Sequence, residues 1–341
     1  MKIAAEAQEI EQFATRKQID KLYRTFKTDY STFKNKTTSN RCDPLLLKQH
    51  FEKHFCNVEA DYDPVDFHPV PEFIKVLQKI NSRHIKSGPP DLNELTTIIK
   101  KLKDGKSAND IPSVFIKHAI DNEKFAKEMV LLYNTVFQSH VIPQQWRHSK
   151  LVALWKGPTK GAIDNPEAYR GLQIGSSLCK ILVIIIMTRL QSWYESQLTD
   201  QQQGFRRDRG TTDGVFVAKR VQQVTRAMKK PVFLLFVDLS AAFDHVERSW
   251  LFATIKKRLD PNADKSLITL LEKLYSYTTT ALSQSPDKIF ETKTGVRQGG
   301  PESPGLFNLF IDFVMRIYLD SCKKRRNSIF EASLFHTKIR V

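Results

Sequence analysis

The first part of the chain places its apolar residues at helical intervals. From residue 1 to about residue 30, apolar side chains recur mostly three or four positions apart, with charged residues between them. This spacing predicts one or two amphipathic helices. A polar segment that ends at Pro44 predicts a connector, and we expect a helix from Leu45 to about Cys56. Residues 61–73 are rich in turn formers.

A second group of helices is expected from residue 91 onward. Asp91 can cap a helix, and Glu94 follows three residues later, as in a capping box. We expect this helix to stop by Gly105. The apolar spacing at residues 111–120 and 125–143 predicts two further helices, of which the second is ended by a proline.

From about residue 149, the spacing of apolar residues changes from helical intervals to short β-rich runs. SKLVALWKG, at residues 149–157, predicts a strand that a glycine ends, and PVFLLFVDL, at residues 231–239, is a near-continuous apolar run. Such a run is typical of a central strand that is buried on both faces. A strongly apolar helix is expected to start after Pro304. The sequence therefore predicts an α+β protein that is helical first and has its sheet later.

The charge balance favours a polyanionic partner. The 341 residues include 53 Lys and Arg against 37 Asp and Glu, which gives a formal net charge of +16. Nucleic acid is the first expectation for so basic a chain. The basic residues form four clusters spread along the sequence, and a solvated helix face explains any one cluster more readily than all four together. Hydrophobic residues make up 41% of the chain, enough for one large core or two modest ones.

Cysteine spacing and apolar run lengths predict an intracellular location, nuclear or cytoplasmic. The four cysteines have no zinc-finger spacing, so we expect reduced thiols. The N-terminus lacks the apolar core of a signal peptide. The longest apolar run, Ile181–Met187, is far shorter than the roughly 20 residues that span a bilayer, so no membrane partner is expected.

Asp238 stands at the end of the apolar run 231–239. A strand that delivers an aspartate at its end, followed by the small-residue turn LSAAF, exposes a carboxylate and a backbone carbonyl at one place. Magnesium binds at such places through one or two carboxylates and substrate phosphates. An aspartate that caps the following helix is an equally good interpretation of the same residues.

A glycine-rich segment and two arginine-containing segments are further candidates for binding nucleotides or nucleic acid. The RQGGPESPG segment at residues 297–305 suits the close approach of a phosphate or a base, although a plain structural turn explains it as well. Arg170 lies beside an aromatic residue and a glycine, and QQGFRRDRG at residues 202–210 holds three arginines. Such groups suit triphosphate or nucleic-acid backbones, but single arginines are more often ordinary surface residues.

Taken in order, these segments resemble a known family. WRHSKLVALWKG, NPEAYRGLQI, QQGFRRDRGTTDG, FVDLSAAFD and RQGGPESPGLFN resemble the reverse-transcriptase domain of LINE-type (non-LTR) retrotransposons in sequence and in spacing. The resemblance covers about residues 92–319. It implies a right-hand polymerase fold with helical fingers and a palm, Mg²⁺ as cofactor, and an RNA template, an RNA/DNA hybrid and dNTP as partners.

The resemblance also implies roles for individual residues. Asp238 would be the first Mg²⁺ ligand, with the carbonyl of Leu239 beside it. Phe243 would lie under the sugar and exclude a 2′-hydroxyl, whereas Asp244 is expected to be structural. The incoming nucleotide and template base would pack on Gln298 and Gly299. The residues implied to hold the triphosphate are Lys156 and Arg170, and those implied to face nucleic acid are Arg206, Arg207 and Arg209.

The chain departs from the family pattern inside these motifs. Gly300 stands where the family usually has Asp, and Glu302 stands where it often has an apolar residue. Asp208 and Gly210 replace a small residue and a serine. These departures weaken the expectation of full activity.

The largest departure concerns the second set of metal ligands. The family supplies it as a Tyr/Phe-x-Asp-Asp hairpin, and the sequence contains no Asp-Asp pair. The segment most similar to this motif is Tyr318–Ser321. It continues the helix that follows Pro304, so we expect Asp320 to be a helix-end residue. We therefore expect a catalytically incomplete, truncated polymerase domain whose open strand edge makes it marginally stable.

The expected organisation has three parts. Residues 1–90 form a helical N-terminal extension, residues 91–230 the fingers, and residues 231–341 an incomplete palm, with no thumb. Two alternatives stay open for the function. One is a non-catalytic RNA-binding module derived from a reverse transcriptase, which the net charge favours. The other is a polymerase completed by a second polypeptide that carries the hairpin.

Overall fold

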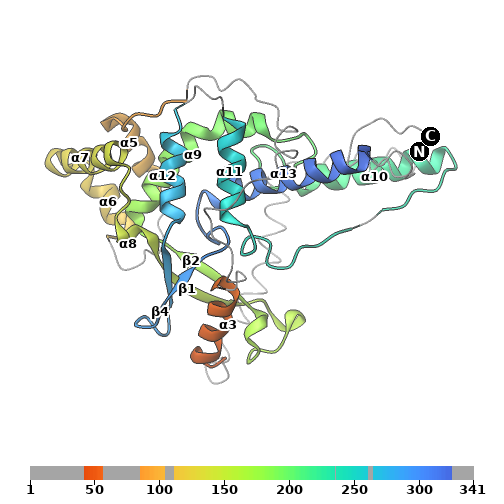
Figure 1. Ribbon diagram of the computed structural model, residues 1–341, viewed down its shortest axis with the longest axis horizontal. Helices are drawn as coiled ribbons and strands as arrows, with labels where there is room; N and C mark the ends of the chain where they lie inside the picture. The colour runs from red at the N-terminus through yellow and green to blue at the C-terminus, as the bar shows by residue number, and fades with distance from the viewer. Residues whose placement is uncertain (1–41, 57–84, 104–110, 235, 260–263, 325–341) are drawn as a thin grey trace, which may run out of the picture. The chain divides into compact units, whose positions relative to one another are not determined.

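The structure is a computed structural model that describes residues 42–56, 85–103, 111–234, 236–259 and 264–324 (Figure 1). The helices expected before residue 30 and the turns expected at residues 61–73 lie outside the described residues. The chain divides into two compact units. The described parts of the smaller unit are residues 42–47 and Trp155–Tyr169, and the larger unit comprises Lys48–Leu154 and Arg170–Val341. The predicted division at residues 90 and 230 stays a prediction.

Helices make up most of the described chain. They are α3 (Pro44–Cys56), α5 (Leu92–Lys100), α6 (Ser113–Ala119), α7 (Glu123–Ser139), α8 (Gln144–Arg147), α9 (Ser177–Gln197), α10 (Thr211–Ala227), α11 (Arg248–Arg258), α12 (Ser266–Tyr275) and α13 (Ser303–Lys324). Short 3₁₀ segments occupy Pro158–Lys160 and Pro166–Ala168. The helices expected near residues 45–56, 92–104, 111–120, 125–143 and after Pro304 are confirmed as α3, α5, α6, α7 and α13. Asp320 lies within α13.

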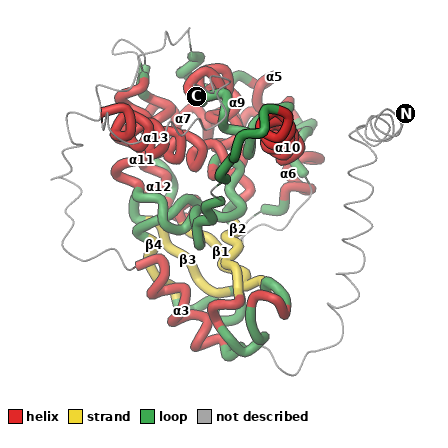
Figure 2. The backbone as a smooth tube through the Cα atoms, turned by 90° about the vertical axis from the view of Figure 1, so that its right-hand side faces the viewer, coloured by secondary structure: helices red, strands yellow, loops and turns green. Residues whose placement is uncertain are grey.

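One four-stranded sheet accompanies the helices. Its order is β2 (Tyr169–Ile174), β1 (His148–Trp155), β3 (Thr278–Leu282) and β4 (Ile289–Thr292). Strands β1 and β3 run parallel, with His148 opposite Thr279, and β3 and β4 run antiparallel. The strand expected at residues 149–157 is therefore confirmed as β1. In Figures 1 and 2, helices α5, α9 and α12 lie to one side of this sheet.

The prediction of a buried central strand at residues 231–239 is wrong. The described residues of this segment belong to no strand, and the side chains of Phe233 and Phe236 are 90% and 85% exposed. Apolar composition favours burial, but a strand also needs a neighbouring backbone for its hydrogen bonds, and β1 to β4 pair among themselves. The helix-cap interpretation of Asp238 is also wrong, because Glu247 caps α11 by accepting from the backbone N–H of Ser249.

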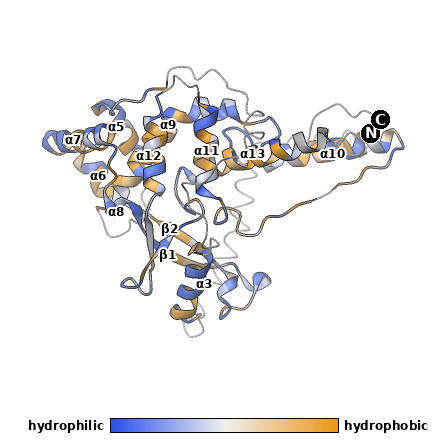
Figure 3. Cartoon of the chain, in the orientation of Figure 1, coloured by the Kyte–Doolittle hydropathy of each residue, from blue (hydrophilic) through white to orange (hydrophobic). Residues whose placement is uncertain are grey.

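Helix α9 supplies the centre of the hydrophobic core. Its side chains pack with those of α5, α7, α11, α12 and α13, and Ile181, Leu182, Ile185 and Ile186 are fully buried. Apolar and polar positions along the helices are coloured in Figure 3. By length and composition alone α9 could cross a membrane, but 56% of its most apolar window is buried inside the protein, as in the core helix of a soluble protein.

An ion pair joins α5 to α9 beside this core. Asp91 accepts from the backbone N–H of Glu94, as the capping pattern predicted. The Glu94 carboxylate receives two hydrogen bonds from Arg189, at 2.7 and 2.8 Å, and the Arg189 side chain is only 4% exposed. Arg189, and after it Lys86, holds the pKa of Glu94 below its ordinary value of 4.5. This pair should therefore make the stability depend on pH.

Removing the Glu94 charge tests that dependence. A depressed carboxyl pKa contributes stability that is present above the ordinary value of 4.5 and is lost as the pH falls through the folded value. We expect Glu94→Gln to lower the free energy of unfolding at pH 7 by about 1–3 kcal/mol, with a difference from the native chain that shrinks toward acid pH. Thermal unfolding at pH 7 and in acid measures this.

Glu123→Gln is the matched control. Glu123 pairs with Lys127 one turn away on α7, and both side chains are largely exposed. An exposed pair of this kind contributes little, so its loss should leave the unfolding temperature unchanged. An equal drop in unfolding temperature in both variants would contradict a special role for the Glu94–Arg189 pair. So would a Glu94→Gln effect on stability that does not change with pH.

Candidate nucleotide site

The glycine-rich turn and the segment after Asp238 are joined by their backbones. The N–H of Gly295 donates to the carbonyl of Val246 at 2.9 Å, and the N–H of Val296 donates to the carbonyl of Phe243 at 2.8 Å. Gly295 has φ +81°, and a Cβ there would lie 2.8 Å from the Asp244 backbone. Glycine is therefore required at this crossing. Two motifs about fifty positions apart in the sequence meet here.

The other side of the turn packs on strand β2. The carbonyl of Gln298 accepts from the N–H of Gln173 at 2.8 Å. Gly299 has φ +112°, and a Cβ on it would lie 2.8 Å from the carbonyl oxygen of Gln173 and 2.9 Å from Leu172 Cδ1. The structure therefore fixes Gly299 through close backbone packing, while leaving it exposed on its outer side.

Asp244 holds the side chain of Gln298. Asp244 is buried, and both its carboxylate oxygens lie 2.8 Å from the amide nitrogen of Gln298. His54 Nε2 lies 3.1 Å from Asp244 Oδ2. Sequence reasoning did not find His54, although two histidines one turn apart, His50 and His54, on a short amphipathic helix were a signal that could have drawn attention.

Arg248, the first residue of α11, clamps the chain that leads into the turn. Its guanidinium donates to the carbonyls of Thr292, Thr294 and Gly295 at 2.7, 3.0 and 2.8 Å, and to the carbonyl of Tyr275 at 3.0 Å. Burial lowers the pKa of Arg248 to about 10, so the group remains charged at neutral pH. Its hydrogen bonds offset the cost of burying that charge.

A second buried arginine lies inside the turn itself. Arg297 donates to the carbonyls of Leu274 at 3.1 Å and Trp146 at 3.4 Å, and its guanidinium lies 5.4 Å from the centre of the Tyr275 ring. The Tyr275 hydroxyl donates to Glu302 Oε1 at 2.9 Å. Burial raises the pKa of Tyr275, and the charge of Glu302 raises it further, so the hydroxyl keeps its proton.

The two departures in this turn are linked. Glu302 is buried, and a Cβ on Gly300 would lie 2.6 Å from its Oε2 and 2.7 Å from its Oε1. The Glu302 carboxylate therefore occupies the volume that a side chain at position 300 needs. A side chain at position 300 would therefore have to displace the Glu302 carboxylate.

Asp238 itself is exposed and lies in irregular chain. Leu239 beside it is also exposed, whereas Phe243 is half-buried between the rings of Phe205 and Phe307, at centroid distances of 5.6 and 4.7 Å. The residues that the structure describes contain no group of three or more His, Cys, Asp or Glu side chains that could hold a metal ion. These residues as arranged do not fit a catalytic metal around Asp238.

Lys156 and Arg170 belong to different units and are described separately. Lys156 is exposed in the smaller unit, where its ammonium donates to the carbonyl of Glu167 at 2.9 Å. Arg170 is exposed on β2 in the larger unit. Their implied role in holding a triphosphate stays a prediction.

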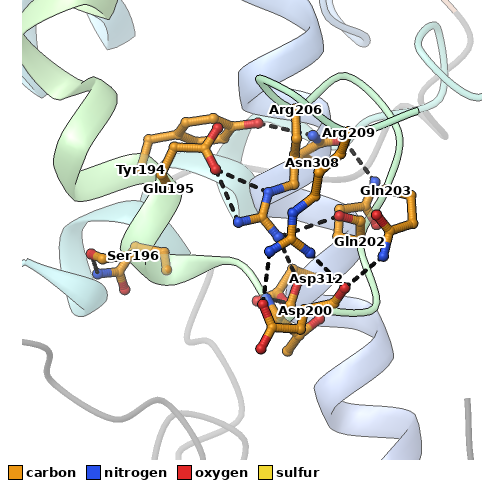
Figure 4. A network of polar contacts seen from close by, with 12 residues as sticks. Tyr194, Glu195, Ser196, Asp200, Gln202, Gln203, Arg206, Arg209, Asn308 and Asp312 are labelled. Atoms are coloured by element: carbon orange, nitrogen blue, oxygen red, sulfur yellow. Dashed lines mark hydrogen bonds and ion pairs between the residues drawn. The ribbon is translucent and has the colours of Figure 1, made fainter. Parts of the chain in front are cut away.

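The arginines of the 202–210 loop have different environments, and Figure 4 shows those of Arg206 and Arg209. Arg206 is nearly buried, pairs with Glu195 at 2.9 Å and donates to the carbonyl of Thr199 at 2.8 Å. Arg209 donates to the Asp200 carboxylate at 2.9 Å. The Arg207 side chain is 76% exposed and has only a 3.5 Å contact with its neighbour Asp208. Arg206 and Arg209 therefore hold the loop, and Arg207 points outward.

Helix α13 anchors the same loop from the other side. Asn308 donates to the carbonyl of Gly204 at 2.8 Å, and Asp312 accepts from the N–H of Thr199 at 3.1 Å. Asp312 also pairs with Arg258 at 2.9 Å, and both side chains are almost fully buried. Sequence reasoning missed these residues, although two polar residues one turn apart in an apolar helical stripe were a usable signal.

Comparison with known proteins identifies the family of this chain. Residues 158–334 match the family model for reverse transcriptase (RNA-dependent DNA polymerase), a range of 177 of the 341 residues. The chain belongs to the reverse transcriptase family. The matched range includes the 243–246 segment and the turn at 295–300. Polymerases of this family use a divalent metal, an RNA template and nucleotides.

Relatives come from insect retrotransposons. The chain is 28% identical over 185 residues to a probable RNA-directed DNA polymerase from transposon BS of Drosophila melanogaster, covering 53% of this chain and 20% of that protein. It is 25% identical over 213 residues to the Pol polyprotein of retrotransposable element R2DM of Drosophila melanogaster, with coverages of 62% and 18%. It is 26% identical over 222 residues to the Pol polyprotein of retrotransposable element R2 of Popillia japonica, covering 64% of this chain and 29% of that protein.

These comparisons confirm the predicted LINE-type reverse-transcriptase domain. The chain spans less than a third of the length of each of these relatives. The mixed helix and sheet content agrees with the α+β prediction.

The link between positions 300 and 302 can be tested by a double-mutant cycle. Gly300→Asp alone should destabilise the chain by about 1–3 kcal/mol, because the new side chain meets the Glu302 carboxylate. Glu302→Leu alone should also destabilise it, because it leaves the buried Tyr275 hydroxyl without its acceptor. In the double variant, the cost of Gly300→Asp should largely disappear. Urea unfolding of the four chains measures this coupling, and additive losses would contradict it.

Proposed function

We propose that the 295–300 turn contacts the incoming dNTP and the template base, through Gln298 and Gly299. The observation that carries the proposal is the joining of this turn to the 243–246 segment by two backbone hydrogen bonds and the Asp244–Gln298 contact. Both pieces lie within the range that matches reverse transcriptases. A rigid turn with exposed glycine backbone suits the close approach of a nucleotide.

Further roles follow from the same proposal. Phe243, half-buried between two other rings, lies under the sugar and disfavours a 2′-hydroxyl. Arg170 and Lys156, both exposed, bind the triphosphate. Asp238 and the carbonyl of Leu239 would serve as metal ligands only together with carboxylates from outside the described residues. In the right-hand arrangement of polymerases, we assign residues 91–230 to the fingers, residues 231–341 to an incomplete palm, and residues 1–90 to an N-terminal extension.

Arg207 is the arginine of its loop that we assign to nucleic acid. Arg206 and Arg209 are engaged by Glu195 and Asp200, whereas Arg207 is exposed. The net charge of +16 supports a polyanionic partner. We propose RNA template and RNA/DNA hybrid as these partners.

Nucleotidyl transfer is not expected from these 341 residues acting alone. The reaction in this class of enzyme needs two divalent ions held by several carboxylates. The sequence has no Asp-Asp pair, and the described residues assemble no acidic group around Asp238. On this proposal the 341 residues bind template, primer and nucleotide, and the chemistry needs further carboxylates from outside them. The alternative is an RNA-binding module without nucleotide binding.

Binding to poly(rA)/oligo(dT) tests the proposal. Fluorescence anisotropy should show an affinity that falls linearly with salt on logarithmic axes. Arg207→Ala should weaken binding roughly threefold to tenfold and reduce the salt slope by about one, with an unchanged unfolding temperature. Arg206→Ala should lower the unfolding temperature instead, because Glu195 and the loop carbonyls lose their donor.

Lys127→Ala is the matched control, since Lys127 is an equally exposed cation on α7 and should leave affinity unchanged. Adding Mg²⁺ and dTTP should increase binding without extending the primer. A chain that binds RNA but never dTTP supports the RNA-binding alternative. Extension by the native chain that Asp238→Ala abolishes would contradict the expected need for further carboxylates.

A further inference from the structure

The orientation of the Gln298 side chain is set by Asp244. Both Asp244 oxygens lie 2.8 Å from the Gln298 amide nitrogen. A carboxylate only accepts hydrogen bonds, so the amide nitrogen faces Asp244 and the amide oxygen points away. Gln298 is only partly buried, so part of this residue stays accessible.

Asp244 is in turn oriented from a distant part of the sequence. His54 Nε2 lies 3.1 Å from Asp244 Oδ2, and the two side chains are 21% and 8% exposed. Because the carboxylate can only accept, Nε2 of His54 carries the proton in this contact. The His54 ring also packs against the rings of His50 and His245, at centroid distances of 6.0 and 5.1 Å.

The end of helix α3 that carries His54 is fixed beside the sheet. The N–H of Lys293 donates to the carbonyl of Phe55 at 3.0 Å, and the Cys56 thiol donates to the carbonyl of Glu291 at 3.1 Å. Lys293 lies two residues before Gly295, where the turn meets the 243–246 segment. The helix end and the turn are thus held by the same short stretch of chain.

We infer that Asp244 and His54 are positioning residues for Gln298, so that α3 takes part in nucleotide binding. Helix α3 lies outside residues 158–334, which match the family. The inference rests on the proposed nucleotide contact of Gln298. A free Gln298 side chain would have to be ordered each time a nucleotide binds, and Asp244 removes that cost beforehand.

A double-mutant cycle in dTTP binding tests the inference. The native chain and its variants are bound to poly(rA)/oligo(dT) with a dideoxy-terminated primer, so that no chemistry occurs. Gln298→Ala and Asp244→Ala should each weaken dTTP binding roughly threefold to tenfold. The double variant should bind no more weakly than Gln298→Ala alone, because Asp244 acts only through Gln298. His54→Ala should give a smaller loss, and Asp244→Asn should retain part of the affinity.

Ile255→Val is the control for general destabilisation. Ile255 is fully buried on α11 and does not contact the Gln298 amide, so this change should lower stability by about 0.5–1.5 kcal/mol and leave dTTP affinity unchanged. Native dTTP affinity in Asp244→Ala, or additive losses in the double variant, would overturn the inference.

Hydrogen exchange in the unliganded chain separates this inference from the proposed function. Asp244→Ala, and to a lesser extent His54→Ala, should speed amide exchange at residues 296–300 more than Ile255→Val does. If the native chain binds no dTTP, the proposed function fails, while faster exchange still supports positioning. If exchange at residues 296–300 stays unchanged in Asp244→Ala, the positioning role fails even where dTTP binds.

Discussion

Two buried guanidinium groups hold the centre of this protein together. Arg248 donates hydrogen bonds to the carbonyls at positions 292, 294 and 295, and Arg297 donates to those of Leu274 and Trp146. Both guanidinium groups lie against the Tyr275 ring. A buried cation is costly unless its donors are used, and carbonyls left without donors are costly as well. Neither arginine can therefore be replaced without disturbing the turn between β4 and α13.

The consequences of this constraint reach the motifs on either side. Because Arg248 and Arg297 hold the turn in place, its backbone can pair with the 243–246 segment and pack on β2. The Glu302 carboxylate, which accepts from Tyr275, fills the space beside Gly300. Gly300 and Glu302, which depart from the family pattern, are thus packed against each other in this turn. The proposed nucleotide contact gains a rigid support from residues that never need to touch the nucleotide.

Sequence reasoning predicted what depends on local pattern and missed what depends on distant partners. Helical periods found α3, α5, α7 and α13, and the motif order found the family. The apolar run at 231–239 was wrongly predicted as a buried strand, because its composition does not say which backbone would pair with it. The arginines of the 202–210 loop look alike in sequence, but only the fold shows that Arg206 is buried and Arg207 exposed. The spacing of His50 and His54 marks their helix but does not reveal the partner of His54, which lies 190 positions away.

The central claim is that a nucleotide contacts the joined 243–246 and 295–300 segments. Photocrosslinking tests it most directly, with 4-thio-dTTP bound to the chain on poly(rA)/oligo(dT) and the labelled residues identified by mass spectrometry. The account predicts crosslinks within residues 296–300 or 243–246, and their loss when unlabelled dTTP competes. Crosslinks confined to other parts of the chain, or labelling that dTTP does not compete away, would contradict it.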